Sequence, residues 1–406
     1  MENQAKSFTV LMLPWLAHGH VSPYLELAKK LIARNFIIYL CSTHANLASV
    51  RSKLDESFSQ SIKLVELHLP ESDELPPHYH TTNGLPANLM STLKDAFEKG
   101  CPNFCRILKN LKPDLVIYDL LQPWAPISAA FYNIPAVEYI TNGIAMTALG
   151  YHSLVSPGTK FPFESTIFCR DYESDFAKRL LVHDKDTRRV MQCMQRSNDI
   201  VLVKSFKEIE GKYGDYLSTL VGKQIVPVGH LVQDPVFNDD DQDCEVMEWL
   251  NEKEKGSTIF VSFGSEYFLS TKDMVEIAHG LEMSKVYFIW VVRFPKGENI
   301  SLEEILPEGF FTNLEGREIG IGIEVLRDSS ANLHKDTIAK VINQVVKGID
   351  GEKVRNKARE LSEKIGSKGE NEELDEVVKK LVKLCLLKNK KIYPLPNEEQ
   401  DLSKDD

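Results

Sequence analysis

A histidine between a buried strand and an amphipathic helix is the residue of this sequence best placed to do chemistry. His20 follows Gly19 in the segment Trp15-Leu-Ala-His-Gly-His20. The preceding run, Phe8 to Leu13, is continuously apolar, as in a parallel strand that is covered on both faces. Open α/β sheets bind ligands in the crevice at the carboxyl ends of their strands, so the pattern predicts that His20 lies in such a crevice. A loop histidine without chemistry is the alternative.

A second apolar strand ends in a carboxylate that could support this histidine. The segment Lys112-Pro-Asp-Leu-Val-Ile-Tyr-Asp119 has the same buried character and ends at Asp119. A histidine that takes a proton from a hydroxyl needs its far ring nitrogen held and its imidazolium stabilised, and an aspartate can do both. We therefore predict that His20 is a general base and that Asp119 lies within hydrogen-bond reach of it.

Further elements must position these two residues. Strand-like runs at 36–41, 62–67, 114–118, 136–140, 200–204 and 225–228 alternate with helical stretches. After His20, apolar residues recur at helical spacing over 24–31, and Pro23 suits the first turn of a helix. This alternation predicts a doubly wound parallel sheet.

The chain is long enough for two domains. We expect an N-terminal domain over 1–232, an acidic linker over 233–245, a C-terminal domain over 246–387 and a disordered tail over 388–406. In the second domain the apolar run 257–262 leads to Gly264 and Ser265, which could contact a phosphate at the start of a helix. An ordinary turn is the alternative.

Composition excludes several classes of function. The net charge of -11, without a basic stripe, argues against a nucleic-acid partner. No apolar run is long enough to cross a bilayer, and the start does not resemble a signal peptide, so we expect a cytoplasmic protein. The seven cysteines lack paired metal spacing and fit a reducing compartment.

Taken together, the motifs resemble one enzyme family. The frames Gly-His-x-x-Pro-x-Leu-x-Leu-Ala-Lys-x-Leu and Asp-Leu-Val-Ile-Tyr-Asp-x-x-Gln-Pro-Trp are similar to those of plant UDP-dependent glycosyltransferases of the inverting two-domain class, GT-B. The resemblance covers about 9–314 and 318–385. It is strongest to the branch that adds glucose to a sugar already attached to a terpenoid, flavonoid or similar aglycone. Further matches are Val226-Pro-Val-Gly229, Val261-Ser-Phe-Gly-Ser-Glu266 and Phe288-Ile-Trp-Val-Val-Arg293.

The resemblance carries expectations about fold and site. It implies an α/β protein with two Rossmann-like doubly wound domains, acting as a monomer without a metal. UDP-glucose would be the co-substrate and a small-molecule glycoside the acceptor. The residues carried over are His20 and Asp119 for catalysis, Gly19, Gly264 and Ser265 for the donor, and Trp15 and Trp124 for the acceptor.

One segment of the family pattern has no counterpart in this chain. After Leu306-Pro-Glu-Gly-Phe310 the family carries Trp-x-Pro-Gln, His-Cys-Gly-Trp-Asn-Ser, a glutamate and Asp-Gln, which together hold the nucleotide sugar. Here Arg317 is followed directly by Glu318-Ile-Gly-Ile-Gly-Ile-Glu-Val325, which resembles the strand after that donor segment. The last tryptophan is Trp290 and the only later histidine is His334, so no relocated copy lies downstream.

The missing donor segment predicts a truncated second domain and weak or lost UDP-glucose binding. Strands near 258, 287 and 318 would remain, and the first of these would lose its inner neighbour. Three hypotheses follow: an impaired transferase, a non-catalytic glycoside-binding protein, and an unstable product of splicing or gene-model error. Glycoside binding without UDP binding would favour the second.

Overall fold

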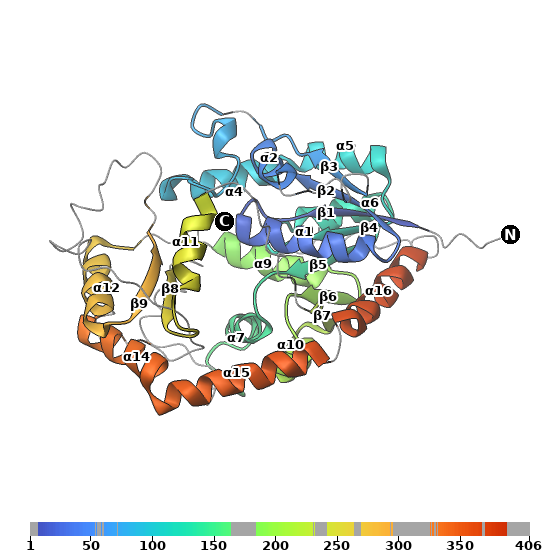
Figure 1. The fold of residues 1–406 in the computed structure, drawn as a ribbon. Coiled ribbons are helices and arrows are strands. Elements are labelled where there is room, and N and C mark those ends of the chain that lie inside the picture. The colour runs from blue at the N-terminus through green and yellow to red at the C-terminus, as the bar shows by residue number, and fades with distance from the viewer. Residues whose placement is uncertain are drawn as a thin grey trace. The chain divides into compact units, whose positions relative to one another are not determined.

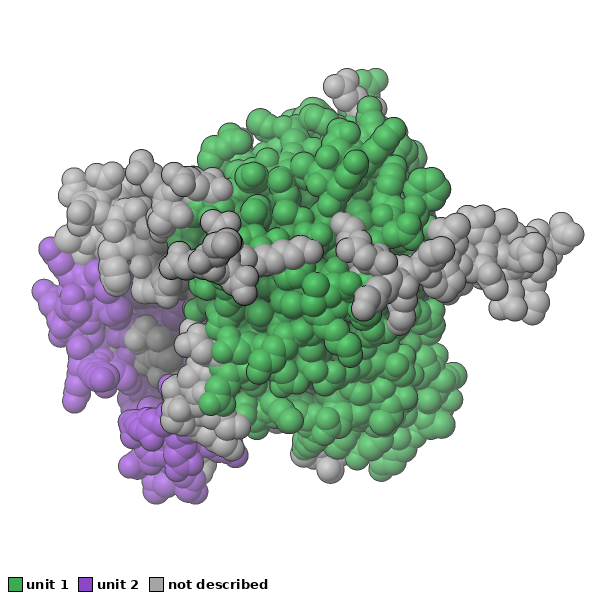
Figure 2. Space-filling model, turned by 90° about the vertical axis from the view of Figure 1, so that its right-hand side faces the viewer, with its two compact units in different colours: residues 1–233, 370–406 green, residues 234–369 purple. Residues whose placement is uncertain are grey.

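The structure is a computed structural model that describes residues 7–52, 54, 58, 61–70, 72–163, 184–229, 231, 242–263, 269–292, 294, 325, 327–328, 330, 332–367 and 370–387. The chain divides into two compact units (Figure 2). Unit 1 comprises 1–233 and 370–406, and unit 2 comprises 234–369.

Unit 1 is built on a seven-stranded parallel sheet (Figure 1). The order β3-β2-β1-β4-β5-β6-β7 reverses direction at β1, as in a doubly wound fold. The predicted α/β class and parallel sheet are therefore confirmed. The strands are β1 (Phe8–Leu13), β2 (Phe36–Ser42), β3 (Ile62–Glu66), β4 (Leu115–Tyr118), β5 (Ala136–Ile140), β6 (Ile200–Val203) and β7 (Gln224–Pro227).

Helices cover both faces of this sheet (Figure 1). Side chains alternate along each strand, so Val10 and Met12 pack on one face and Leu11 and Leu13 on the other. The first face is covered by α1 (His18–Ile32) and α16 (Glu370–Leu387). The second face is covered by α4 (Met90–Lys99), α5 (Cys101–Leu111) and α6 (Trp124–Phe131). The other elements of unit 1 are α2 (His44–Arg51), η1 (Pro77–Tyr79), η2 (Ala87–Leu89), α7 (Ile144–Val155), α9 (Asp184–Arg196) and α10 (Lys207–Val221).

The last helix belongs to unit 1, which differs from the expected domain over 246–387. Leu374, Val377 and Leu381 of α16 are buried in the same apolar cluster as α1 and β1. Arg34 Nε of unit 1 also donates a hydrogen bond to Asp375 Oδ1 at 2.8 Å. The apolar stripe of α16 thus covers part of the sheet face beside α1, and the boundaries fall at 233/234 and 369/370. The expected tail, 388–406, lies outside the described residues.

Unit 2 contains two of the three strands that we expected there. β8 (Thr258–Ser262) and β9 (Tyr287–Val291) pair in parallel. Ile277, Leu281, Ile338 and Ile342 form an apolar cluster against them. The third strand, expected near 318, lies outside the described residues. The helices of unit 2 are α11 (Gln242–Asn251), which begins within the predicted linker, α12 (Thr271–Ser284), α14 (Lys335–Lys347) and α15 (Ile349–Ser367).

Within the described ranges of both units, every helix is too short or too polar to traverse a lipid bilayer.

We expect hydrogen exchange to be much faster in β8 and β9 than in the central strands of unit 1. Among the described residues β8 and β9 pair only with each other, a pair of strands has little stability of its own, and Phe260 in β8 is 54% exposed. Opening free energies within one protein range from near zero to the global value, so a difference of about 100-fold or more in protection is reasonable. Peptide-resolved exchange on the full chain measures it. Helix α16 is the internal control, since it follows unit 2 in sequence and should be protected like unit 1. Equal protection of both units would contradict the expectation.

Candidate active site

The candidate catalytic residues lie at the carboxyl ends of three neighbouring strands. His20 is in the first turn of α1, which follows β1, and Asp119 comes directly after β4. Thr141 follows β5, and the sheet order β1-β4-β5 places the three strands side by side. The strand order reverses at β1, and such a switch point forms the ligand-binding crevice of an open α/β sheet.

His20 and Asp119 are in direct contact, as predicted. His20 Nδ1 lies 2.8 Å from Asp119 Oδ2. The imidazole is 19% exposed, whereas the carboxylate is fully buried. An ionised carboxylate can only accept a hydrogen bond, so this contact assigns the proton to Nδ1 and leaves the lone pair on Nε2. The arrangement therefore suits a histidine that removes a proton from a hydroxyl.

The backbone around Asp119 holds its carboxylate in place. The Trp15 N–H donates to Oδ2 at 3.0 Å, and the Leu120 N–H donates to Oδ1 at 2.8 Å. The Asp119 N–H in turn donates to Gln122 Oε1 at 2.6 Å. These bonds fix the orientation of the Asp119 carboxylate toward His20, where it would stabilise an imidazolium.

The start of α1 differs from the sequence expectation. The helix begins at His18, so His20 lies inside its first turn and Pro23 lies beyond that turn. The first N–H groups of a helix lack a partner within the helix, and here the N–H groups of His20 and Val21 donate to the carbonyl of Ala17, the N-cap residue, at 2.9 Å. The position of His20 is therefore fixed by helical backbone as well as by Asp119.

Two residues near the pair were not singled out from the sequence. Thr141 Oγ1 lies 3.2 Å from His20 Nδ1. Glu138 of β5 is fully buried, and neither carboxyl oxygen has a hydrogen-bond partner in the described part of the chain. Burial, and then the negative charge of Asp119, raises the pKa of Glu138 well above the usual carboxyl value. Burial and the nearby Asp119 thus both favour the neutral form of Glu138. In the sequence, Glu138 could have been noticed as an acidic residue within the otherwise apolar run Ala136–Ile140.

The two tryptophans expected at the acceptor lie in one apolar cluster. Trp15 is 5% exposed and contacts the ring of Phe97 edge-on, with centroids 5.4 Å apart. Trp124 contacts Phe97 at 5.6 Å and Phe104 at 5.4 Å. Both indole rings therefore pack against Phe97, and contact of either tryptophan with an acceptor stays a prediction.

The donor residues are only partly described. Gly19 is the second residue of α1, directly before His20, and an added Cβ there would meet nothing within 4 Å. Gly264 and Ser265 lie outside the described residues. Within the described ranges, no group of three or more His, Cys, Asp or Glu side chains could hold a metal ion.

Comparison with known proteins supports a single family. The family "Glycosyltransferase, N-terminal domain" matches residues 6–232. UDP-glucosyltransferase 29 of Panax ginseng is 42% identical over 449 aligned positions, which cover 95% of this chain and 98% of that protein. The beta-D-glucosyl crocetin beta-1,6-glucosyltransferase of Gardenia jasminoides is 40% identical, with 92% and 98% covered. The Panax alignment is longer than this 406-residue chain, so that relative contains residues without a counterpart here.

Solved structures agree on the fold. A Glycyrrhiza uralensis glycosyltransferase complexed with glycyrrhetinic acid 3-O-monoglucuronide has a TM-score of 0.71 at 19% identity, covering 95% of this chain and 97% of that one. A UDP-glucosyltransferase from Polygonum tinctorium has a TM-score of 0.71 at 20% identity, covering 94% and 100%. With the sequence relatives and the doubly wound sheet, these findings show that the chain belongs to the plant UDP-dependent glycosyltransferases of the GT-B fold.

Proposed function

We propose that this chain is an impaired member of its family, in which an intact acceptor half is joined to an incomplete donor half. The reaction proposed for a chain with a complete donor half is transfer of glucose from UDP-glucose to a hydroxyl of a terpenoid or flavonoid glycoside. The proposal of an intact acceptor half rests on the 2.8 Å contact between His20 Nδ1 and Oδ2 of the buried Asp119. The names of the relatives support a glycoside as acceptor.

The proposed chemistry begins with proton transfer. His20 Nε2 takes the proton of the acceptor hydroxyl, and Asp119 stabilises the resulting imidazolium. The acceptor oxygen then attacks the anomeric carbon from the face opposite UDP, so the bond to the diphosphate breaks and the configuration inverts. The proposed reaction needs no metal, and the protein would act as a monomer.

The donor half is proposed to be defective because most of its binding groups are missing. By resemblance, the absent segment supplies the tryptophan that stacks on uracil, the histidine at the diphosphate and the Asp-Gln pair at the sugar. Aromatic stacking on a base is worth about 1–3 kcal/mol, and a hydrogen bond to a charged group about 1.5–3 kcal/mol. Losing both weakens UDP binding by about 100-fold or more. Ser265 would be the main donor residue left.

A glycoside-binding protein without catalysis is the second candidate. It is favoured by the buried and fully hydrogen-bonded carboxylate of Asp119, whose partners all come from unit 1 and not from the donor segment. Such a protein would bind a glycoside through unit 1 alone.

Ligand binding and turnover by the unmodified chain test the proposal. We expect calorimetry to detect binding of a flavanone 7-O-glucoside or beta-D-glucosyl crocetin, little or no binding of UDP, and little or no product from UDP-glucose. Loss of glycoside binding in a folded chain would contradict an intact acceptor half. Sustained turnover would contradict the donor defect. Aggregation of the purified chain would support the third hypothesis, an unstable product.

A further inference from the structure

Unit 2 contains a cavity that is not part of the site described above. Its volume is about 610 Å³, within the range of roughly 300–1,000 Å³ that is typical of small-ligand pockets. It lies where β8 and β9 begin, lined by Ser257 and Val286, and at the junction of α14 and α15. In sequence, Ser257 comes before β8, whereas Gly264 and Ser265 come after it and lie outside the described residues.

The charge of this cavity is opposite to that of the chain. The protein carries a net charge of -11, yet the cavity is lined by five cationic side chains and one carboxylate, Glu254. None of the five cations forms an ion pair with a carboxylate among the described residues. They are Lys255, Lys285, Lys347, Arg355 and Arg359.

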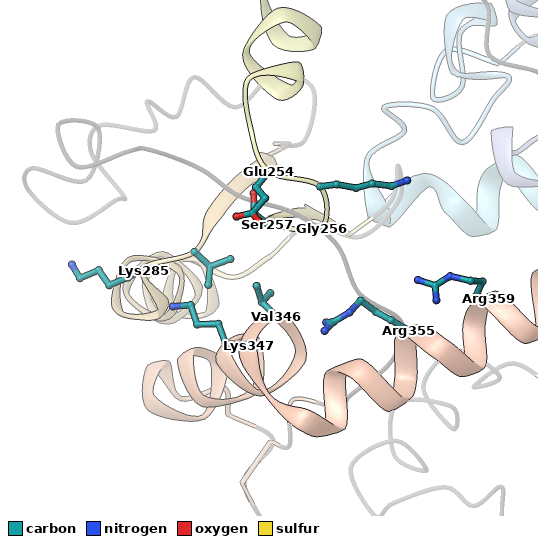
Figure 3. Close-up of a pocket in the computed structure, with 10 residues that line it drawn as sticks. Glu254, Gly256, Ser257, Lys285, Val346, Lys347, Arg355 and Arg359 are labelled. Atoms are coloured by element: carbon teal, nitrogen blue, oxygen red, sulfur yellow. The ribbon is translucent and has the colours of Figure 1, made fainter.

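Two of the cationic side chains that line the cavity are arginines. Arg355 and Arg359 are one turn apart on α15, and Figure 3 shows both extending from this helix toward the side of the cavity where Val346 lies. Like charges at this spacing repel each other, and an anion between them would remove the repulsion. Arg355 Nη1 donates to the Val345 carbonyl at 2.5 Å, which holds the guanidinium while its other N–H groups remain available.

The opposite wall offers a further hydrogen-bond donor. Ser257 Oγ is buried and has no hydrogen-bond partner in the described part of the chain. Lys347 also lines the cavity, and its Nζ lies 3.3 Å from the Ser284 carbonyl, which uses one of its three donors. Figure 3 shows that the ammonium of Lys285 extends away, so Lys285 contributes its stem.

We propose that this cavity binds a small phosphate-bearing anion, with Arg355 and Arg359 as its principal ligands and Ser257 as a donor from the facing turn. Guanidinium groups match phosphate oxygens in pairs, which gives Arg an advantage over Lys at such sites. The bound anion would join the starts of β8 and β9 to α15. It would thereby stabilise unit 2 in proportion to its concentration.

Pyrophosphate is the probe for the test, titrated calorimetrically into the full chain at constant ionic strength. We expect saturable binding that weakens by roughly ten- to 100-fold in Arg355→Gln and in Arg359→Gln, since each removes charged hydrogen bonds. Lys357→Gln is the matched control, because it removes one exposed charge from the same helix without lining the cavity.

A second measurement does not depend on variants. In the unmodified chain, pyrophosphate should raise hydrogen-exchange protection around 254–257 and 345–359 and leave unit 1 unchanged. Absence of saturable binding would overturn the proposal, as would equal weakening in Lys357→Gln. Saturable binding that both arginine variants leave unchanged would place the anion at another site and also overturn it.

Discussion

A donor segment from a homologous glycosyltransferase, inserted between Arg317 and Glu318, is expected to give this chain glucosyl transfer from UDP-glucose to a small-molecule glycoside. The unmodified chain should give little or none. Negative charge develops on the diphosphate as it leaves, and groups that stabilise such charge lower the barrier more than most other catalytic groups do. Initial rates of glycoside product formation, measured chromatographically for both chains, provide the comparison.

The insertion experiment needs a control that adds the same number of residues without the donor-binding groups. A Gly/Ser-rich insert of equal length should leave the chain inactive, because it supplies neither the stacking ring nor the charged contacts. Restored UDP binding without transfer would place a second defect in the acceptor half. Robust transfer by the unmodified chain would show that the residues still present, Ser265 among them, suffice for donor binding.

The pairing of His20 with Asp119 could be predicted because each follows a continuous apolar run. Such runs identify strands that are buried on both faces, and their carboxyl ends share one edge of a parallel sheet. The sequence therefore indicated which residues meet at that edge without a detailed fold. The observed 2.8 Å contact also required that β1 and β4 be neighbours, which the apolar runs do not specify and which the family resemblance implied.

The residues that surround His20 and Asp119 could not be predicted from the sequence in the same way. Thr141 reaches His20 only because β5 lies beside β4, and Glu138 lies near Asp119 for the same reason. Lateral strand order depends on crossover connections, which the apolar pattern of a single strand does not encode. The sequence shows an acidic residue within an apolar strand at Glu138, but its raised pKa depends on the residues that surround it.

The final helix shows a similar limit. Its apolar positions at helical spacing predict a buried stripe, and Leu374, Val377 and Leu381 are buried. The stripe does not specify which unit supplies the facing surface. Nearness in sequence favoured unit 2, whereas the buried residues of the helix belong to the apolar cluster of α1 and β1 in unit 1.

In the chain with the donor segment restored, His20→Ala should lower the rate of glucosyl transfer by about 10²- to 10⁴-fold, the usual value of a general base. UDP binding should be retained, because the base acts on the acceptor and the donor contacts lie elsewhere. Rates of transfer with saturating UDP-glucose, together with UDP titration, separate the two effects. His18→Ala is the matched control, since it removes an exposed imidazole from the same helical turn and should keep most of the activity.

In the same chain, Asp119→Asn should lower the rate of glucosyl transfer by as much as His20→Ala or by less. It alters the support of the base and not the base itself. Oδ2 of Asp119 faces the Trp15 N–H and His20 Nδ1, and Oδ1 faces the Leu120 N–H. The amide group of an asparagine would direct N–H groups at one of these donors, so either a backbone bond or the histidine tautomer must change. Full activity of both variants would show that His20 and Asp119 do not perform the proton transfer.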